Sequence, residues 1–258
     1  MTSCCTYIAR LRDIAFLTLL AVFPAMAGGA AAQDLAQAPT TPTNDVAIIA
    51  TVFTTPLEQV WQAVITEAGI PFKRTTALQG RRRRMFIEGF VTIDCCFSPA
   101  WRNRPEEQVV QLFTDSIYVT EIRYVFKKGE TIPMPSPQRL RNLRFAVVRG
   151  FDYTFMDYFG EIIAVNSPAD AMRLVELGRA DVTESSKVQF EYDMARHPRA
   201  LVLGDVSNYT SLHARVHISR ADLLPRLNAA IGRMKKDGRI QKILKDAIQS
   251  KSRPHSSP

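Results

Sequence analysis

The 258-residue sequence is poor in cysteine and in long apolar runs. Its four cysteines form two adjacent pairs, and its four histidines lie far from the internal pair, Cys95 with Cys96. Metal sites need cysteine or histidine ligands at short, repeated spacings, and the sequence lacks such a pattern. His213 and His217 are four residues apart, but their segment predicts a strand, where this spacing does not form a helical two-histidine site. We expect no metal and no cofactor.

Signatures of catalysis are missing as well. The sequence has no serine in a nucleophile elbow, no histidine with a triad partner in a motif, no P-loop and no G-x-G-x-x-G loop. A composition of 46% hydrophobic and 22% charged residues argues against a disordered, collagen-like or coiled-coil chain. We therefore expect a globular protein that is not an enzyme. Distant residues can still converge into a catalytic site, so a secreted enzyme stays as an alternative.

One apolar run stands at the N-terminus. Arg10 and Arg12 precede the run Ile14 to Phe23, and two triplets of small residues, A-M-A and A-A-A, follow it. This order is typical of a cleaved secretory signal peptide, and the run is shorter than the ~20 residues of a membrane span. We expect residues 1–32 to be a signal peptide for export. An uncleaved anchor is the alternative.

The adjacent Cys95 and Cys96 fall in a predicted strand. Successive side chains of a strand point to opposite faces, and neighbouring cysteines can close only a strained ring. We therefore interpret the two residues as small buried apolar side chains. A redox role is the alternative.

Positive charge exceeds negative charge, with 33 Lys and Arg against 25 Asp and Glu and a net charge of +8. The densest basic cluster, Arg81 to Arg84, has no interleaved aromatic residues on a definable surface. Export also removes most nucleic-acid partners. We expect this cluster to be a solvated helix face and expect no nucleic-acid contact.

Strands and capped helices alternate along the chain. The apolar run Val46 to Val52 predicts a buried parallel strand, and Thr55-Pro56-Leu57-Glu58 is a capping box that opens a helix ending near Gly69. Ser167 and Ser219 open two later helices that end at Gly178 and near Gly238. The remaining pattern predicts strands at 70–75, 90–97, 118–127 and 143–148 and a helix at 79–88.

This alternation predicts an α/β protein with two lobes, each a mostly parallel sheet flanked by helices. The Pro-rich connection from Gly129 to Gln138 is the expected passage from one lobe to the next. The segment after Pro198 is interpreted as a return crossing to the first lobe.

Three segments of the second half of the chain together carry a family resemblance. Phe145 to Tyr153 (FAVVRGFDY) leads from a strand into a helix start, Ala171 to Val182 contains a helix and a G-R-x-D strand start, and Leu227 to Leu244 forms a helix pair. In order and spacing they resemble the second-lobe entry, the following helix and strand, and the C-terminal helices of the family 3 extracellular solute-binding proteins. The resemblance covers most of the chain after the signal.

The resemblance implies a two-lobed periplasmic binding protein-like fold and the function of an ABC importer's periplasmic substrate-binding protein. Such a protein is a monomer that captures a small polar or anionic, amino-acid-like solute between its lobes and delivers it to an ABC transporter permease. The implied division is a leader at 33–44, lobe 1 at 45–138 with 211–250, lobe 2 at 139–210, and a tail at 251–258. A periplasmic sensing or accessory protein without a transport role is the alternative.

Candidate ligand contacts lie where strands end, because ligands of open α/β sheets collect at the carboxyl ends of strands. The family places a carboxylate-gripping arginine in the region that reads Ser98 to Pro105, so Arg102 or Arg104 is its equivalent by resemblance. Arginine can hold a carboxylate or phosphate through two parallel hydrogen bonds. A solvent-screened surface arginine is the alternative, and Trp101 would stack on a ligand or fill the core.

Two further segments are expected at the cleft. The backbone N–H groups of Gly150 and Phe151 can meet an anionic group, while Asp152 either joins them or caps a helix that follows. Glu184 lies just beyond a strand end, where it pairs with a ligand amine or remains a solvated acid. The candidate ligand-binding residues are Ser98, Trp101, Arg102, Arg104, Gly150, Phe151, Asp152 and Glu184.

Overall fold

The computed structural model describes residues 47–51, 55–133, 136–153 and 155–250. The predicted signal peptide at 1–32, the leader at 33–44 and the tail at 251–258 lie outside the described residues. Among the residues that are described, no helix is both long enough and apolar enough to span a bilayer.

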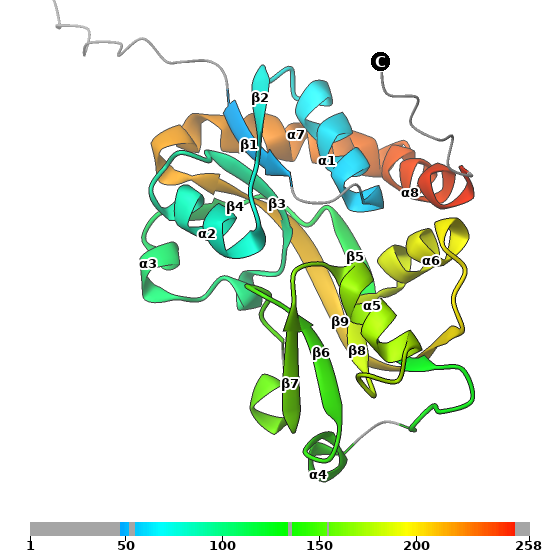
Figure 1. The fold of residues 1–258 in the computed structure, drawn as a ribbon. Coiled ribbons are helices and arrows are strands. Elements are labelled where there is room, and N and C mark those ends of the chain that lie inside the picture. Colours follow the sequence, from blue (N-terminus) through cyan, green and yellow to red (C-terminus); the bar gives the residue numbers. More distant parts are fainter. Residues whose placement is uncertain (1–46, 52–54, 134–135, 154, 251–258) are drawn as a thin grey trace, which may run out of the picture. The chain divides into compact units, whose positions relative to one another are not determined.

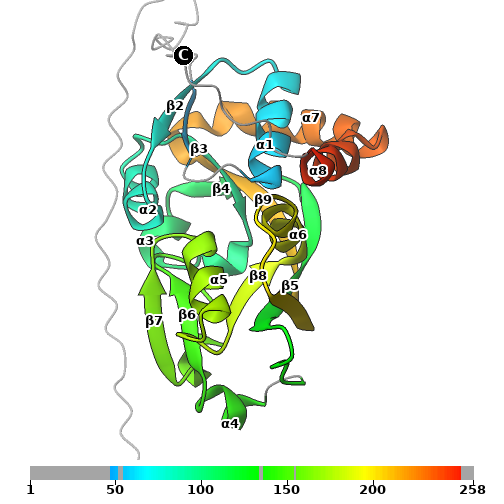
Figure 2. The same ribbon diagram turned by 45° about the vertical axis from the view of Figure 1, so that its right-hand side comes forward.

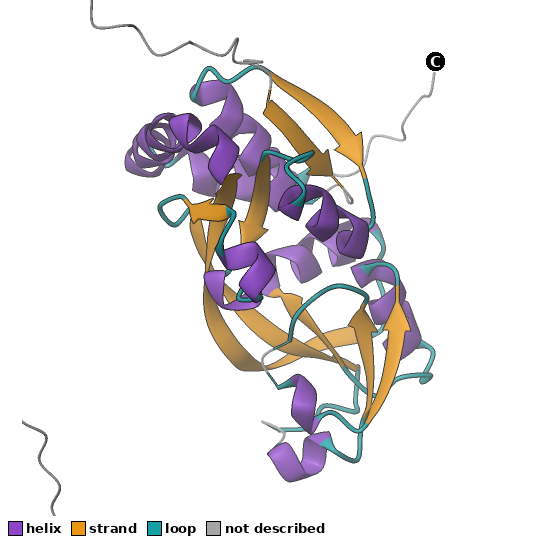
Figure 3. Cartoon of the chain, turned by 90° about the vertical axis from the view of Figure 1, so that its left-hand side faces the viewer, coloured by secondary structure: helices purple, strands orange, loops and turns teal. Residues whose placement is uncertain are grey.

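The first lobe is built on a parallel core of three strands in the order β2-β1-β3. The last strand, β9, pairs antiparallel with β3 and with the short β4. Helices flank these strands, as Figure 3 shows. The elements are β1 (Ala47–Thr51), α1 (Pro56–Glu67), β2 (Phe72–Thr76), α2 (Gln79–Ile87), β3 (Ile93–Phe97), α3 (Pro105–Gln108), β4 (Gln111–Phe113), α7 (Leu224–Lys236) and α8 (Arg239–Gln249).

The capping box forms α1 as the sequence predicts. The Thr55 hydroxyl accepts a hydrogen bond of 3.0 Å from the Glu58 backbone N–H, and Pro56 occupies the first turn, where no N–H partner is needed. The face that includes Val60, Trp61 and Val64 is buried in the core of the first lobe, with side chains of α7 and α8. This packing holds the start of α1 at the carboxyl end of β1.

The second lobe has a parallel strand pair, β6 with β7. Phe145 of β6 also forms a parallel bridge to Val182, the residue directly before β8. Its buried side chains form two apolar clusters, one under α5 and one around the aromatic rings of Tyr124, Phe145 and Phe159. The elements are α4 (Pro137–Leu140), β6 (Arg144–Val148), β7 (Glu161–Val165), α5 (Pro168–Glu176), β8 (Thr183–Ser186) and α6 (Lys187–Arg196).

Two long strands connect the lobes. β5 (Tyr118–Lys127) and β9 (Leu201–His217) pair antiparallel from Tyr118↔Leu212 to Lys127↔Leu201, and Figure 1 shows them running from the helices α1, α7 and α8 toward β6 and β8. Register shifts interrupt this ladder between Ile122 and Val125. Tyr118, at the first end of β5, packs against the core of the first lobe, and Val125 packs in that of the second.

The sheets are mixed rather than mostly parallel. The pairs β1/β2, β1/β3 and β6/β7 are parallel, but every pair that involves β5 or β9 is antiparallel. The cause is that β9 returns through both lobes beside strands that run the other way, as expected of a return crossing.

Two predicted helix starts differ in the structure. After Asp152, in the described residues, the chain forms only a 3-10 turn, Met156–Tyr158, and the predicted helix is absent. Ser219 lies in a 3-10 helix, Ile218–Leu223, and α7 begins separately at Leu224. The backbone leaves the helical conformation at Arg220, and Pro225, which has no N–H to donate, stands in the first turn of α7, where none is needed.

Candidate functional site

A cavity of about 220 Å³ is lined by residues of both lobes, and we call it the interlobe cavity. Strand ends and helix starts supply its walls, as expected for an open α/β sheet. From the first lobe it is lined by Leu57, Glu58, Arg82, Cys95, Cys96, Phe97, Trp101 and Arg102. From the second lobe it is lined by Val148, Phe151, Asp152, Tyr153, Glu184 and Gln189.

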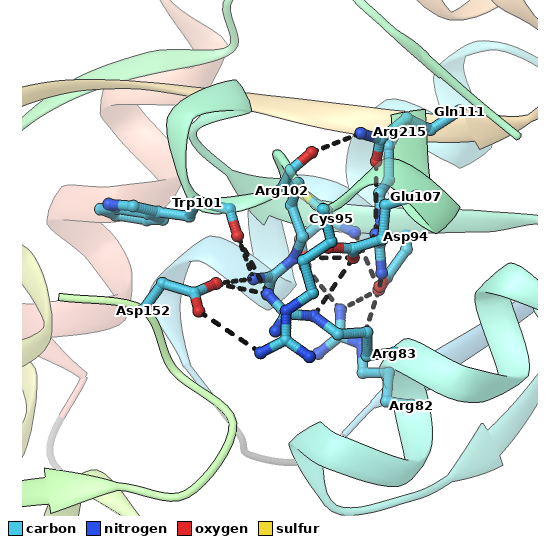
Figure 4. A network of polar contacts seen from close by, with 11 residues as sticks. Arg82, Arg83, Asp94, Cys95, Trp101, Arg102, Glu107, Gln111, Asp152 and Arg215 are labelled. Atoms are coloured by element: carbon cyan, nitrogen blue, oxygen red, sulfur yellow. Dashed lines mark hydrogen bonds and ion pairs between the residues drawn. The ribbon is translucent and has the colours of Figure 1, made fainter. Parts of the chain in front are cut away.

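Four arginines form a buried cluster beside this cavity (Figure 4). Arg215 of β9 is 0% exposed, Arg102 is 2% exposed, and Arg82 and Arg83 of α2 are also buried. The guanidinium groups of Arg102 and Arg215 stack on Phe97 and Phe86, at 4.0 and 3.9 Å from the ring centroids. Such burial requires partner carboxylates, because an isolated charge in the interior is very costly.

Three carboxylates supply the partners, two of them wholly inside the first lobe. Asp94 pairs with Arg82 and, at 3.2 Å, with Arg215. The Oε1 atom of Glu107 lies 2.7 Å from Nη1 of Arg215 and 3.2 Å from Nε of Arg83. The third carboxylate is Asp152 of the second lobe.

The buried cluster carries an excess of one positive charge, since four arginines face three carboxylates. Several of its polar atoms have no hydrogen-bond partner, namely Nε and Nη1 of Arg83, Nε of Arg102 and Nε of Arg215, together with Oε2 of Glu107. Burial, with the nearby charges of Arg83 and Arg215, lowers the pKa of Arg102 to about 9. The site is therefore electrostatically suited to an additional anionic group.

The interpretation of Arg81 to Arg84 as a solvated helix face is wrong for two of the four. Arg82 and Arg83 are buried, whereas Arg81 and Arg84 are exposed. The 3.6-residue period explains the difference, because Gln79, Arg82, Arg83 and Phe86 share the inward face of α2. Arg82 lines the interlobe cavity, so the basic cluster is part of the site.

Asp152 does not cap a helix. Its Oδ2 atom accepts hydrogen bonds from Arg83 and, at 2.9 Å, from Nη1 of Arg102. Arg104 is a more distant partner, at 3.9 Å from Oδ1, and its side chain is exposed. Asp152 therefore joins the second lobe to the arginine cluster of the first.

Five of the eight sequence-predicted site residues line the interlobe cavity: Trp101, Arg102, Phe151, Asp152 and Glu184. Ser98, Arg104 and Gly150 are outside its lining. Gly150 serves a different purpose, because it has a φ of +82° and a Cβ atom there would lie 2.9 Å from the backbone nitrogen of Gly80 at the start of α2. The glycine allows close approach of the two lobes.

The sequence reasoning missed Glu58, Arg82 and the cysteine pair as lining residues. Glu58 carries a usable signal, because its capping box places it at a helix start directly after a strand. Burial raises its pKa, and Nε2 of Gln62 donates a hydrogen bond of 3.3 Å to its Oε1. Asp94, Glu107 and Arg215 carry no comparable signal.

Glu184 is the acidic counterpart of the arginine cluster. Its Oε1 atom is shielded from solvent and has no hydrogen-bond partner, and burial raises the pKa of Glu184 to about 7. A ligand ammonium group would supply the missing partner and favour the ionised form. The cavity thus presents guanidinium groups from one lobe and a carboxyl with one unpartnered oxygen from the other, an arrangement that can hold a zwitterion.

Replacing Glu184 with glutamine tests this carboxyl. The folded protein retains the Glu184 proton between about pH 4.5 and 7, where the unfolded chain has lost it, so ionisation destabilises the fold as the pH rises through this window. Relative to Glu184→Gln, we expect the unfolding free energy of the wild type to fall by on the order of 2 kcal/mol from pH 5 to pH 7.5. Urea denaturation at several pH values measures it, and parallel profiles would show that Glu184 is normally solvated.

The structure joins Cys95 and Cys96 in a disulfide, so the interpretation as two separate buried apolar residues is wrong. Both residues line the interlobe cavity instead of pointing to opposite faces. The pairing of β3 with β9 shifts register between Cys95 and Phe97, which breaks the alternation that a regular strand would impose.

No protein-family model matches the sequence, and no curated protein matches it. Solved structures match the fold over most of the chain. The substrate-binding protein AbpA of an amino acid ABC transporter from Streptococcus pneumoniae, bound to L-arginine, superposes with a TM-score of 0.66 at 13% identity, covering 80% of this chain and 95% of that one. This chain has the fold of a periplasmic binding protein.

The periplasmic binding protein fold recurs in other matches with different roles. A variant of ArgBP from T. maritima has a TM-score of 0.65 at 14% identity, covering 80% of this chain and 96% of its own. A histidine kinase sensor domain with similarity to periplasmic binding proteins also has a TM-score of 0.65, at 16% identity, covering 81% and 98%. The predicted two-lobed α/β architecture is confirmed, and the fold occurs in both transport and sensing proteins.

Proposed function

We propose that the chain is a periplasmic substrate-binding protein that captures a small polar or anionic, amino-acid-like solute between its lobes for an ABC importer. The observation that carries the proposal is the buried excess of one guanidinium group on the cavity wall of the first lobe, together with the unpartnered Oε1 atom of Glu184 on that of the second. An α-amino acid offers a carboxylate to the first and an ammonium group to the second. The arginine bound to AbpA is an amino acid, which supports this class of solute.

In the proposed mechanism, Arg102 and Arg82 hold the anionic group, Trp101 and Phe151 pack against the solute, and Glu184 receives the amine. Neither lobe alone encloses the solute, so binding favours the closed state. Export to the periplasm, action as a monomer and delivery to a permease belong to the same proposal. The lobe boundaries at 138/139 and 210/211 are proposed too, with side chains of β5 contributing to both cores.

A thermal-shift screen of amino acids, carboxylates and phosphorus oxyanions tests the proposal. A solute that binds only the folded state raises the melting temperature by mass action. We expect amino acids or small anions to give a saturable rise and uncharged analogues of the same size to give none. If no zwitterion or anion in the screen raises the melting temperature, the proposed function is wrong.

A sensing or accessory role is the second candidate. The similarity to a histidine kinase sensor domain favours it, because that match is as good as those to transport proteins. A permease and an ATPase encoded beside this protein would favour import. Chemical conversion of the bound solute would indicate an enzyme instead.

The Asp152 contacts predict a measurable effect on lobe closure. Asp152→Asn removes the charge that joins the lobes and leaves Arg83 and Arg102 with one counter-charge fewer. Since the Asp152 side chain is 34% exposed, we expect a loss of about 1–3 kcal/mol in unfolding free energy and a larger radius of gyration without solute. Small-angle scattering and denaturation measure both.

Asp157→Asn is the matched control, because Asp157 lies five residues further along and is exposed. We expect the control to scatter like the wild type. An Asp152→Asn variant that scatters like its control would show that these ion pairs do not hold the lobes together.

A further inference from the structure

The Cys95–Cys96 disulfide lies on the cavity wall next to the arginine cluster. The Cys95 carbonyl accepts a hydrogen bond of 2.5 Å from Nη2 of Arg82, and its N–H donates one of 3.1 Å to Oδ1 of Asp94. The same backbone unit therefore carries one half of the disulfide and holds an ion pair of the cluster. Phe97 and Arg102 line the cavity beside it.

Oxidation state changes what these two residues present to the cavity. A disulfide has no titratable proton and no charge, so the oxidised pair is a fixed apolar contact. Two free thiols are separately mobile, and a thiol, unlike a disulfide, can lose a proton and become a thiolate. The reduced pair can therefore place a thiolate beside a cluster that has one positive charge too many.

We propose that the cysteine pair makes the cavity's affinity for anions depend on redox state. The oxidised form leaves the excess guanidinium charge free for an anion, and in the reduced form a thiolate of Cys95 or Cys96 neutralises that charge. This inference rests on the proposed function only for its biological use, because the anion preference is a property of the cavity itself.

The chemical step is a two-electron reduction by a dithiol. A thiolate of the reductant attacks one sulfur of the pair, the bond between Cys95 and Cys96 breaks, and a mixed disulfide forms. The second thiol of the reductant then attacks the reductant's own sulfur in the mixed disulfide. This breaks the bond to the protein and releases the two reduced cysteines and a cyclic disulfide of the reductant. Cys96 is only partly buried and borders the cavity, so the reductant has a route to it.

Quenching of tryptophan fluorescence tests the proposal without any solute. The chain has two tryptophans: Trp101 lines the cavity, and Trp61 is 2% exposed in the core. Iodide reports the charge of the cavity, and acrylamide, which is neutral, reports its accessibility. The protein carries Cys4→Ser and Cys5→Ser so that only the internal pair reacts, and Trp101→Phe supplies the background.

We expect dithiothreitol at pH 8 to lower the iodide quenching constant of Trp101 by at least about twofold, with the acrylamide constant unchanged. In Cys95→Ala/Cys96→Ala, where no thiolate can form, the iodide constant should stay high with or without reductant. The wild-type comparison stands alone if that double variant fails to fold.

Three results would overturn the proposal. They are an iodide constant unaffected by reduction, two thiols that react in the folded protein before reductant is added, and loss of folded structure upon reduction. None of them affects the solute screen, so a saturable solute would still support the proposed function.

Discussion

Arg102→Ala is expected to weaken binding of the solute selected by the screen by about 2–5 kcal/mol, or roughly 30-fold and more in Kd. Arg102 is 2% exposed and lines the interlobe cavity, so an anionic group bound there would be left buried without its partner. Isothermal titration of wild type and variant measures the difference. Most of the loss should appear as faster dissociation.

Arg104→Ala is the control, because its side chain is 51% exposed and reaches Asp152 only at 3.9 Å. We expect it to change affinity by less than about 1 kcal/mol. Equal effects of the two variants would favour a general electrostatic attraction over a specific contact. Unchanged affinity in Arg102→Ala would remove Arg102 from the site.

Glu107→Gln is expected to cause the largest loss of stability. Glu107 is 0% exposed and faces Arg215, Arg83 and, at 3.9 Å, Arg102, so neutralising it leaves three buried arginines short of counter-charge. Removing one partner from a buried ion pair costs about 3–5 kcal/mol. For a chain of this size we expect a fall in Tm of roughly 6 °C or more, measured by calorimetry.

The adjacent Glu106 provides a matched comparison. It lies on the same short helix and is exposed, so Glu106→Gln should change the unfolding free energy by less than about 0.5 kcal/mol. A Glu107→Gln protein as stable as its Glu106→Gln counterpart would mean that the arginine cluster does not need this carboxylate. An added anion that restores the stability of Glu107→Gln would show that the cluster accepts an external counter-charge.

Much of the fold could be predicted because its signals are local. Thr55 with Glu58 and Ser167 with Asp170 form the predicted helix caps, and the predicted strand at 118–127 coincides with β5. Pairing direction depends on which strands meet, and the segment after Pro198 has no local mark of its antiparallel path beside β3 and β5. The prediction of a helix after Asp152 is wrong. The Asp152 carboxylate accepts hydrogen bonds from arginines of the other lobe and does not cap the backbone that follows it.

The candidate site was predictable where a residue follows a predicted strand. Arg102 and Asp152 lie in the segments that follow β3 and β6, and both line the cavity. Glu184 lines the cavity too, but it is the second residue of β8, so its predicted place beyond a strand end is wrong. Arg215 lies within β9, and its burial depends on its ion pairs with Asp94 and Glu107. These two residues lie 121 and 108 positions earlier in the sequence, so no local pattern predicts the pairs. The four consecutive arginines of α2 are likewise predicted to be exposed from their charge alone. Only the orientation of α2 decides that Arg82 and Arg83 face inward and the other two outward.

Helix α6 belongs to both cores. Val188 packs in the core of the first lobe and Phe190 in that of the second, and Nη2 of Arg196 donates hydrogen bonds to the carbonyls of Ala247 and Ser250 at the end of α8. Figure 2 shows α6 between α8 and β8. Rotation of the lobes can therefore leave both contacts of α6 intact only if the rotation axis passes close to the first turn of this helix. Gln189, between these two residues, would then hold its place on the cavity wall while the walls farther from the pivot swing apart.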